Sequence, residues 1–167
     1  MILVKSIILL LILSSFTINM IEVRNLYEIA AENRMANTKL TNLLASAKSD
    51  NPIISGYKGA SIMMEANHVF NPLTKLSRFK KGKQLLEAAI KLDQANVELR
   101  YIRLTIQTNV PGFLGYSSAI EADKRSIINA LDQSKDLDLR KRMVNYLIGA
   151  KICSTEELKK VTLWKNK

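Results

Sequence analysis

The sequence predicts an all-α protein, on three observations. Apolar residues recur at steps of three and four through most of the chain, as in Phe79, Gly82, Leu86 and Ile90, and this period lines one face of a helix. Asparagine, aspartate, proline and glycine interrupt the period where helices end and begin. No alternating pattern typical of a strand extends over a useful length after residue 20. With 167 residues the chain is expected to form one domain, and folding at this size buries roughly two-thirds of the unfolded surface.

The first twenty residues differ from the rest. Lys5 is their only charge, residues 6–13 are almost wholly aliphatic, and polarity returns from Ser14 onward. This order, a short positive region followed by an apolar core and a more polar exit, is typical of an export signal. The apolar run of residues 6–13 is short for a membrane span, which needs roughly 20 apolar residues. No small-x-small cleavage site follows, so an uncleaved anchor and a buried core helix remain alternatives. Residues 1–20 are therefore expected to be a signal peptide or N-terminal anchor, and residues 21–167 a single helical domain in the periplasm or envelope.

The chain is basic, with a formal net charge of +10. Such a balance is typical of nucleic-acid binding, but an exported protein rarely meets nucleic acid as its ligand, so we expect none. An anionic envelope surface, an acidic partner or plain solubility are the remaining interpretations. The single cysteine, Cys153, excludes a disulfide scaffold.

About seven helices are expected after the first segment, in residues 26–47, 53–69, 73–92, 97–108, 121–131, 137–148 and 156–163. The first range allows one long helix, or two shorter ones with Asn37 or Thr38 capping the second. Pro52 and Pro72 suit the first turns of the two helices that follow.

Residues 73–107 are expected to be two amphipathic helices in antiparallel contact, separated by the turn and cap residues 93–96. This hairpin cannot bury its apolar face alone, so flanking helices should stack on it. A long loop follows in residues 110–118. Ser154 and Glu157 have the spacing of a capping box for the last helix.

An internal period supports a stack of helix pairs. The motif Leu-Leu-x-x-Ala ends at Ala47 and recurs with its end at Ala89, and a weaker version ends at Ala130. The intervals are about forty residues, and a period between 20 and 50 is typical of helical repeats. Chance similarity between apolar helix ends is the alternative.

Residues 82–98 carry a more specific pattern: Gly82-x-x-x-Leu86-x-x-Ala89-Ile90-x-Leu92-Asp93-Gln94-x-Asn96-x-Glu98. This pattern resembles the second helix and exit turn of a tetratricopeptide repeat, with Gln94 where a proline is usual. The period nearer forty than thirty-four, Arg103-Leu104 in place of a Leu-Gly pair, and the long connections at residues 68–75 and 109–118 depart from the family. The resemblance implies an irregular tetratricopeptide-like stack of antiparallel helical hairpins.

Residues 53–124 are also similar to a group of small exported bacterial proteins of unknown function. The similarity lies in Gly56-Tyr57-Lys58-Gly59-Ala60, Asn71-Pro72-x-x-Lys75-Leu76, Asn96-x-Glu98-x-Arg100 and Pro111-Gly112-Phe113-Leu114-Gly115-Tyr116. It implies a tetratricopeptide-like fold and no activity.

The sequence offers no convincing catalytic, metal or cofactor site. His68 is the only histidine and has no cluster of metal-ligand or nucleophile spacing around it, although Glu65 lies one turn earlier. Cys153 precedes the last helix, where a thiol pKa can be lowered, but no second histidine exists to complete a nucleophilic pair. Both residues are expected to be structural, and the protein is expected not to be an enzyme.

A polar stripe is the better functional candidate. Arg100, Arg103 and Gln107 recur on one side of their predicted helix, opposite Leu99, Ile102 and Ile106. In a stack of helix pairs this stripe would line a concave surface where arginine pairs with a carboxylate. The other expected members of this surface are Tyr57, Lys58, Phe113 and Tyr116. The alternative is intramolecular, with the arginines meeting Glu65, Glu87 or Glu98.

The C-terminal third is a basic pole, with Arg140–Arg142 and several lysines near Trp164. Basic residues with a tryptophan suit an anionic membrane surface, and a solvated helix face is the alternative. We therefore expect an exported non-catalytic interaction module that binds a peptide or partner protein. The other interpretations are a membrane-surface accessory protein that uses the basic pole and an enzyme of unrecognised class. The sequence leaves the oligomeric state open.

Overall fold

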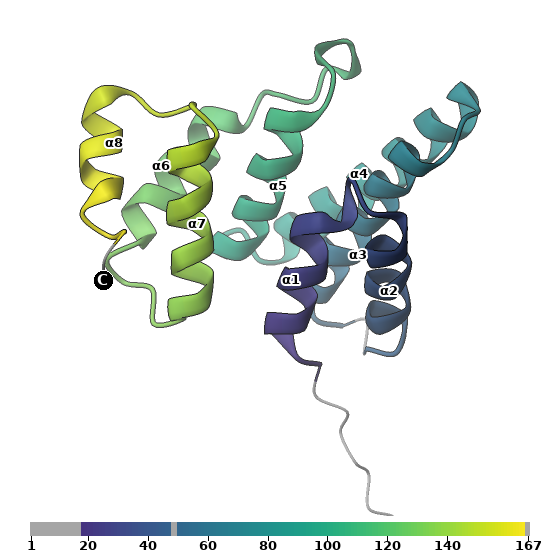
Figure 1. Cartoon of the computed structure of the whole chain (residues 1–167), viewed down its shortest axis with the longest axis horizontal. Coiled ribbons are helices and arrows are strands. Elements are labelled where there is room, and N and C mark those ends of the chain that lie inside the picture. The colour runs from purple at the N-terminus through teal and green to yellow at the C-terminus, as the bar shows by residue number, and fades with distance from the viewer. Residues whose placement is uncertain (1–17, 48–49, 166–167) are drawn as a thin grey trace, which may run out of the picture.

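The computed structural model describes residues 18–47 and 50–165 (Figure 1). The described part is all-helical, which confirms the predicted fold class, and it holds eight α-helices where about seven were expected. They are α1 Met20–Ala30, α2 Arg34–Ala45, α3 Pro52–Glu65, α4 Pro72–Leu92, α5 Val97–Asn109, α6 Ile120–Ala130, α7 Leu137–Gly149 and α8 Thr155–Thr162, with short 3₁₀-helices η1 Ala66–His68 and η2 Gly112–Leu114. Of the predicted signal or anchor segment, residues 1–20, the first seventeen lie outside the described residues.

Asparagine begins most of the helices. The side-chain oxygens of Asn19, Asn33, Asn51, Asn71 and Asn96 each accept a hydrogen bond from a backbone N–H in the first turn of α1 to α5. Asparagine is among the best N-caps because its short side chain satisfies an otherwise unpaired N–H group. The caps therefore set where these helices start.

Two predicted boundaries need correction. The range 26–47 is two helices, as one alternative held, but α1 starts earlier, at Met20, and the cap of α2 is Asn33 and not Asn37 or Thr38. Asn37 lies buried inside α2, where its side-chain oxygen accepts a hydrogen bond from Ser61. At the other end of the chain, the capping box of Ser154 and Glu157 is confirmed.

Consecutive helices pack in pairs: α1 on α2, α3 on α4, α5 on α6 and α7 on α8. The predicted contact between α4 and α5 is present, but it is not the central one, because α4 packs chiefly on α3 and α5 on α6. Glycine explains the choice. A Cβ atom at Gly82 of α4 would lie 2.3 Å from the carbonyl oxygen of Gly59 in α3, so only glycine permits this close approach of the two backbones.

Two hydrophobic cores share α5. Leu99, Ile102 and Ile106 of α5 belong to the core built with α1 to α4, whereas Tyr101 and Leu104 belong to the core built with α6 to α8. Figure 1 shows α5 between these two groups of helices. Asn109 is the one residue of α5 that is exposed. The helix predicted to carry an open polar stripe is thus enclosed along almost its whole length.

Candidate functional site

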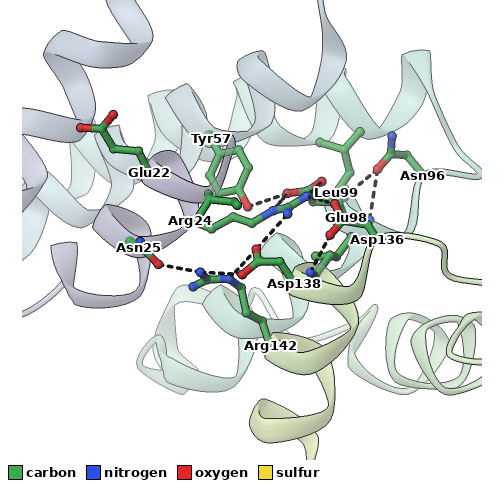
Figure 2. A network of polar contacts seen from close by, with 12 residues as sticks. Glu22, Arg24, Asn25, Tyr57, Asn96, Glu98, Leu99, Asp136, Asp138 and Arg142 are labelled. Carbon is green, nitrogen blue, oxygen red and sulfur yellow. Dashed lines mark hydrogen bonds and ion pairs between the residues drawn. The ribbon is translucent and has the colours of Figure 1, made fainter. Parts of the chain in front are cut away.

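A buried ion pair joins α1 to α5 (Figure 2). Arg24 donates from Nε to Oε1 of Glu98 at 2.7 Å and from Nη2 to Oε2 at 2.9 Å, so the pair is bidentate. Tyr57 of α3 donates its hydroxyl to the same Oε1 at 2.8 Å. Burial raises the pKa of Tyr57 well above its ordinary value, helped by the nearby Glu98 carboxylate, so its hydroxyl stays a donor.

The first turn of α7 completes this network. Arg24 donates from Nη2 to Asp136 at 2.8 Å and from Nη1 to Asp138 at 2.9 Å. Arg142, one turn further along α7, pairs with Asp138 at 2.9 Å and with Glu28 of α1 at 2.8 Å. Two guanidinium groups and four carboxylates thus tie α1, α5 and α7 together, and α7 of the second core is linked to α1 of the first. Figure 2 shows Arg24 between Glu98, Asp136 and Asp138.

A second network centres on Asp123, a fully buried carboxylate near the start of α6. Arg103 donates to its two oxygens from Nε at 2.7 Å and from Nη2 at 2.9 Å, and Arg100 donates from Nη1 at 3.0 Å. Arg103 also reaches Glu87 of α4 at 2.8 Å, and Glu87 accepts the hydroxyl of Tyr116 at 2.5 Å. The hydrogen bond to Asp123 raises the pKa of Arg103 above its ordinary value, although burial opposes the shift.

The predicted stripe on α5 is therefore not an open surface. Arg100 and Arg103 point to Asp123, and the side chain of Arg103 is only 12% exposed. Gln107 is buried, and its Oε1 is the one buried side-chain atom without a hydrogen-bond partner in the described chain. The expectation of an exposed stripe is wrong, because the side of α5 away from the first core faces a second core. The assignment of these residues to ligand binding stays a prediction.

The remaining predicted binding residues are scattered. Tyr57 and Tyr116 are buried in the first core, where they make edge-to-face ring contacts with Tyr27 and Phe79. Lys58 is half-buried, and its Nζ lies 3.4 Å from the carbonyl oxygen of Ala47. Phe113 is 87% exposed on η2. The structure brings Tyr116 near Arg103 through Glu87, and gathers no larger group of them.

The intramolecular alternative identified part of these contacts. Glu87 does pair with Arg103, whereas Glu65 pairs with Arg78 and Glu98 with Arg24. Asp123, the principal partner, was missed. In the sequence it looks like an ordinary acid in the first turn of a helix, and its approach to α5 depends on tertiary packing.

His68 and Cys153 occupy structural positions. His68 Nε2 lies 2.8 Å from the carbonyl oxygen of Ala30, at the end of α1. Burial raises the pKa of the Cys153 thiol, which disfavours the reactive thiolate. Among the described residues, no group of three or more His, Cys, Asp or Glu side chains could hold a metal ion.

The basic pole is partly engaged inside the protein. Arg142 points inward to Glu28 and Asp138. The guanidinium of Arg140 lies 5.1 Å from the ring centroid of Trp164, within cation–π range. Two of the three cations at residues 140–142 are therefore directed at the protein itself.

A polar groove of about 280 Å³ lies between α2 and the junction of α3 with α4. It is lined by Arg34, Asn37, Thr38, Thr41, Asn42, Glu65, His68, Val69 and Arg78. The floor is fixed by hydrogen bonds, because Ser61 of α3 joins Asn37 at 2.9 Å and Thr41 at 2.6 Å. Arg34 is exposed on one flank, and Arg78 pairs with Glu65 at 3.2 Å on the other. Sequence reasoning overlooked this groove, although Arg34, Thr38 and Asn42 recur every four residues on α2.

A second hollow of about 350 Å³ lies between the C-terminal ends of α5 and α7. It is lined by Thr108, Asn109, Asn145, Tyr146, Gly149, Ala150 and Ile152, none of which is charged. The groove at α2 therefore has the stronger means of selecting a charged ligand. In comparisons with known proteins, no family model, no curated protein and no solved structure matches this chain.

Proposed function

We propose that this chain is an exported, non-catalytic interaction module that binds an acidic segment of a partner protein or peptide. The proposed location is the periplasm or envelope, and the proposed architecture is an irregular tetratricopeptide-like stack of helical hairpins. The observation that carries the proposal is the groove between α2 and the α3–α4 junction, with arginine on both flanks.

The pairing of consecutive helices supports the architecture. Residues 82–98, which carry the tetratricopeptide-like pattern, cover the second half of α4 and the start of α5. In that stretch Gly82 meets Gly59 at the α3–α4 contact, and Asn96 caps α5. These are the two places where a helical repeat needs a small residue for close packing and a cap for a sharp turn.

The chemistry of the groove supports an acidic peptide. Hydroxyl and amide side chains such as Thr38 and Asn42 can pair with the backbone of an extended segment. Arg34 and Arg78 supply the planar donors that suit a carboxylate. The net charge of +10 also favours the approach of an anionic partner at low ionic strength.

The two rival functions have less support. Membrane binding through the basic pole would rely on its exposed lysines, because Arg142 is enclosed by two carboxylates and Arg140 lies over Trp164. An enzyme needs a nucleophile or an acid–base pair, and the described residues near His68 and Cys153 offer neither partner set.

Site-specific crosslinking tests the groove. A photo-crosslinking amino acid replaces Thr38 inside the groove, and a matched chain carries it at Lys91 on the exposed face of α4, outside the groove. We expect crosslinks to an acid-rich peptide from Thr38 alone. Arg34→Ala with Arg78→Ala should abolish them, whereas Lys39→Ala with Lys91→Ala removes the same charge outside the groove and should not.

Circular dichroism of each variant verifies that the helices are retained. Equal crosslinking from both positions, or crosslinks that survive loss of both arginines, would refute the groove as the binding site.

A further inference from the structure

The first two turns of α4 project from the body of the protein. Residues 71–77 are all exposed, and the first buried side chain of the helix is Phe79. With 21 residues α4 is longer than its partner α3, which has 14. In Figure 1 this end of α4 extends to the upper right, beyond the other helices. The 3₁₀-helix η1 contacts α4, but none of residues 71–77 is buried, so their side chains contribute little to core packing and are free to serve another purpose.

Large apolar side chains gather on this projection. Phe70, just before the helix, is 99% exposed, Leu73 is 79% exposed and Leu76 is 38% exposed. Leu73 and Leu76 lie one turn apart on one face of the helix, and Leu76 is likewise one turn from Phe79, so these leucines extend the buried apolar face beyond the body of the protein. Isolated exposed apolar residues are common, but an aromatic and two leucines at one protruding end form a patch.

Cations surround the patch. The sequence of α4 contains six lysine or arginine residues and one glutamate. That glutamate, Glu87, is paired with Arg103. Lys75, Lys80 and Lys81 are exposed and make no ion pair within the described part of the chain. The projection is therefore apolar at its end and strongly positive behind it.

We propose that this projection, residues 70–77 with the exposed Lys80 and Lys81 behind them, docks on the surface of an anionic phospholipid bilayer. Phe70 and Leu73 enter the boundary between headgroups and acyl chains, while the lysines lie at the level of the lipid phosphates. Apolar side chains below a layer of lysine are the arrangement that binds amphipathic helices to such interfaces. This inference concerns a different surface from the peptide groove and does not depend on it.

Other occupants fit less well. A partner helix would need a groove with walls, whereas residues 70–77 are all exposed at this end of α4. A second copy of the chain would bring two strongly cationic helix ends together, and their repulsion opposes contact. None of the described helices is long and apolar enough to cross a bilayer, so the proposed contact is with its surface.

Local fluorescence quenching tests the proposal in the full chain. Trp164 is the only tryptophan, so Trp164→Phe provides a silent background. Phe70→Trp then reports on the projection, and Leu92→Trp, 77% exposed at the opposite end of α4, is the matched control. Both positions are exposed, so neither replacement disturbs the core. Vesicles of phosphatidylglycerol and phosphatidylcholine with brominated acyl chains quench only a tryptophan that reaches the acyl region.

We expect quenching and a blue shift at position 70 and neither at position 92. Lys75→Gln, Lys80→Gln and Lys81→Gln together should weaken binding about a hundredfold, since each lysine near an anionic surface contributes about a fivefold gain. Membrane attachment through the N-terminal segment alone would not favour position 70 over position 92. Equal quenching at both positions, quenching at neither, or equal binding to neutral phosphatidylcholine vesicles would overturn the proposal.

Discussion

Replacement of Gly82 by alanine tests the contact on which the fold of the first five helices depends. An ideal Cβ atom at Gly82 would lie 2.3 Å from the carbonyl oxygen of Gly59, 2.6 Å from Cγ of Met63 and 2.8 Å from the backbone nitrogen of Met63. Two of these atoms belong to the α3 backbone and cannot rotate away. α3 and α4 must therefore separate along their most extensive contact to admit one methyl group.

The size of the effect follows from two opposing contributions. Overpacking a well-filled interior costs about 1–3 kcal/mol, and rigid backbone neighbours place this site at the upper end. Alanine in a helix interior is more favourable than glycine by about 1 kcal/mol. The net expectation for Gly82→Ala is a loss of about 2 kcal/mol in the free energy of unfolding. For a domain of this size, that loss lowers the melting temperature by roughly 4–8 °C.

Gly149→Ala is the matched control. Gly149 ends α7, has no positive φ, and a Cβ atom there meets nothing within 4 Å. Alanine should therefore leave stability unchanged or raise it by up to about 1 kcal/mol. Urea unfolding followed by circular dichroism at 222 nm measures both variants, with equal m-values as the sign of an unchanged unfolding reaction. If Gly82→Ala were as stable as Gly149→Ala, the close approach of α3 and α4 would be wrong.

Four further predictions concern the polar interior. Glu98→Gln should lower the free energy of unfolding by about 3 kcal/mol, because it leaves the buried Arg24 with only partly exposed partners. Asp123→Asn should lower the free energy of unfolding by a similar amount. Its control, Asp132→Asn at an exposed position, should stay within about 0.5 kcal/mol of the parent. Gln107→Met should raise stability by about 1 kcal/mol, since it removes a buried oxygen without a partner, and a lower urea midpoint would contradict that explanation. The hydrogen bond from Arg142 lowers the pKa of Asp138 below its ordinary value of 3.8, so the pair stabilises the fold above that pH and the contribution disappears as the pH falls through the lowered pKa. An acid titration of thermal stability should show this loss, and Asp138→Asn should flatten it.

Local structure could be predicted because its determinants are local. The three-and-four period and the cap residues locate α3 to α8 within about four residues of their observed ends. The misplaced cap in the first range has a tertiary cause. Asn37 and Asn33 are equally good caps by residue type, but Ser61 of α3 engages the side chain of Asn37, and no local pattern contains that contact.

The neighbours of each helix could be predicted only in part. Amphipathic helices joined by a short turn usually pack together, which made α4 and α5 the expected pair. Glycine carries the information that decides otherwise, since Gly59 and Gly82 have to face each other for their small size to matter. The glycines of α3 permit a close approach of another backbone, but no local pattern shows which helix approaches them.

The charges on α5 show why the exposure of the predicted stripe was misjudged. The period placed Arg100 and Arg103 correctly on a side away from Leu99 and Ile102, and such a side is normally solvated. Here it lies between two cores, and its charges are neutralised by α4 and α6 through Glu87 and Asp123. A single helix that serves two cores has no solvent side, and local periodicity does not reveal this arrangement.

The same arrangement explains why so many ionic groups lie inside a small protein. Hydrophobic burial has no direction, so two cores sharing one helix could rotate about α5 at little cost in buried area. Glu98, bound from α1 and linked through Arg24 to α7, opposes that rotation from one side. Asp123 opposes it from α6 by accepting from two arginines of α5. Removing one of these carboxylates should therefore loosen the orientation of the two cores relative to each other, as well as lower the free energy of unfolding. A change in hydrogen exchange across α7 in Glu98→Gln would distinguish this orienting role from simple destabilisation.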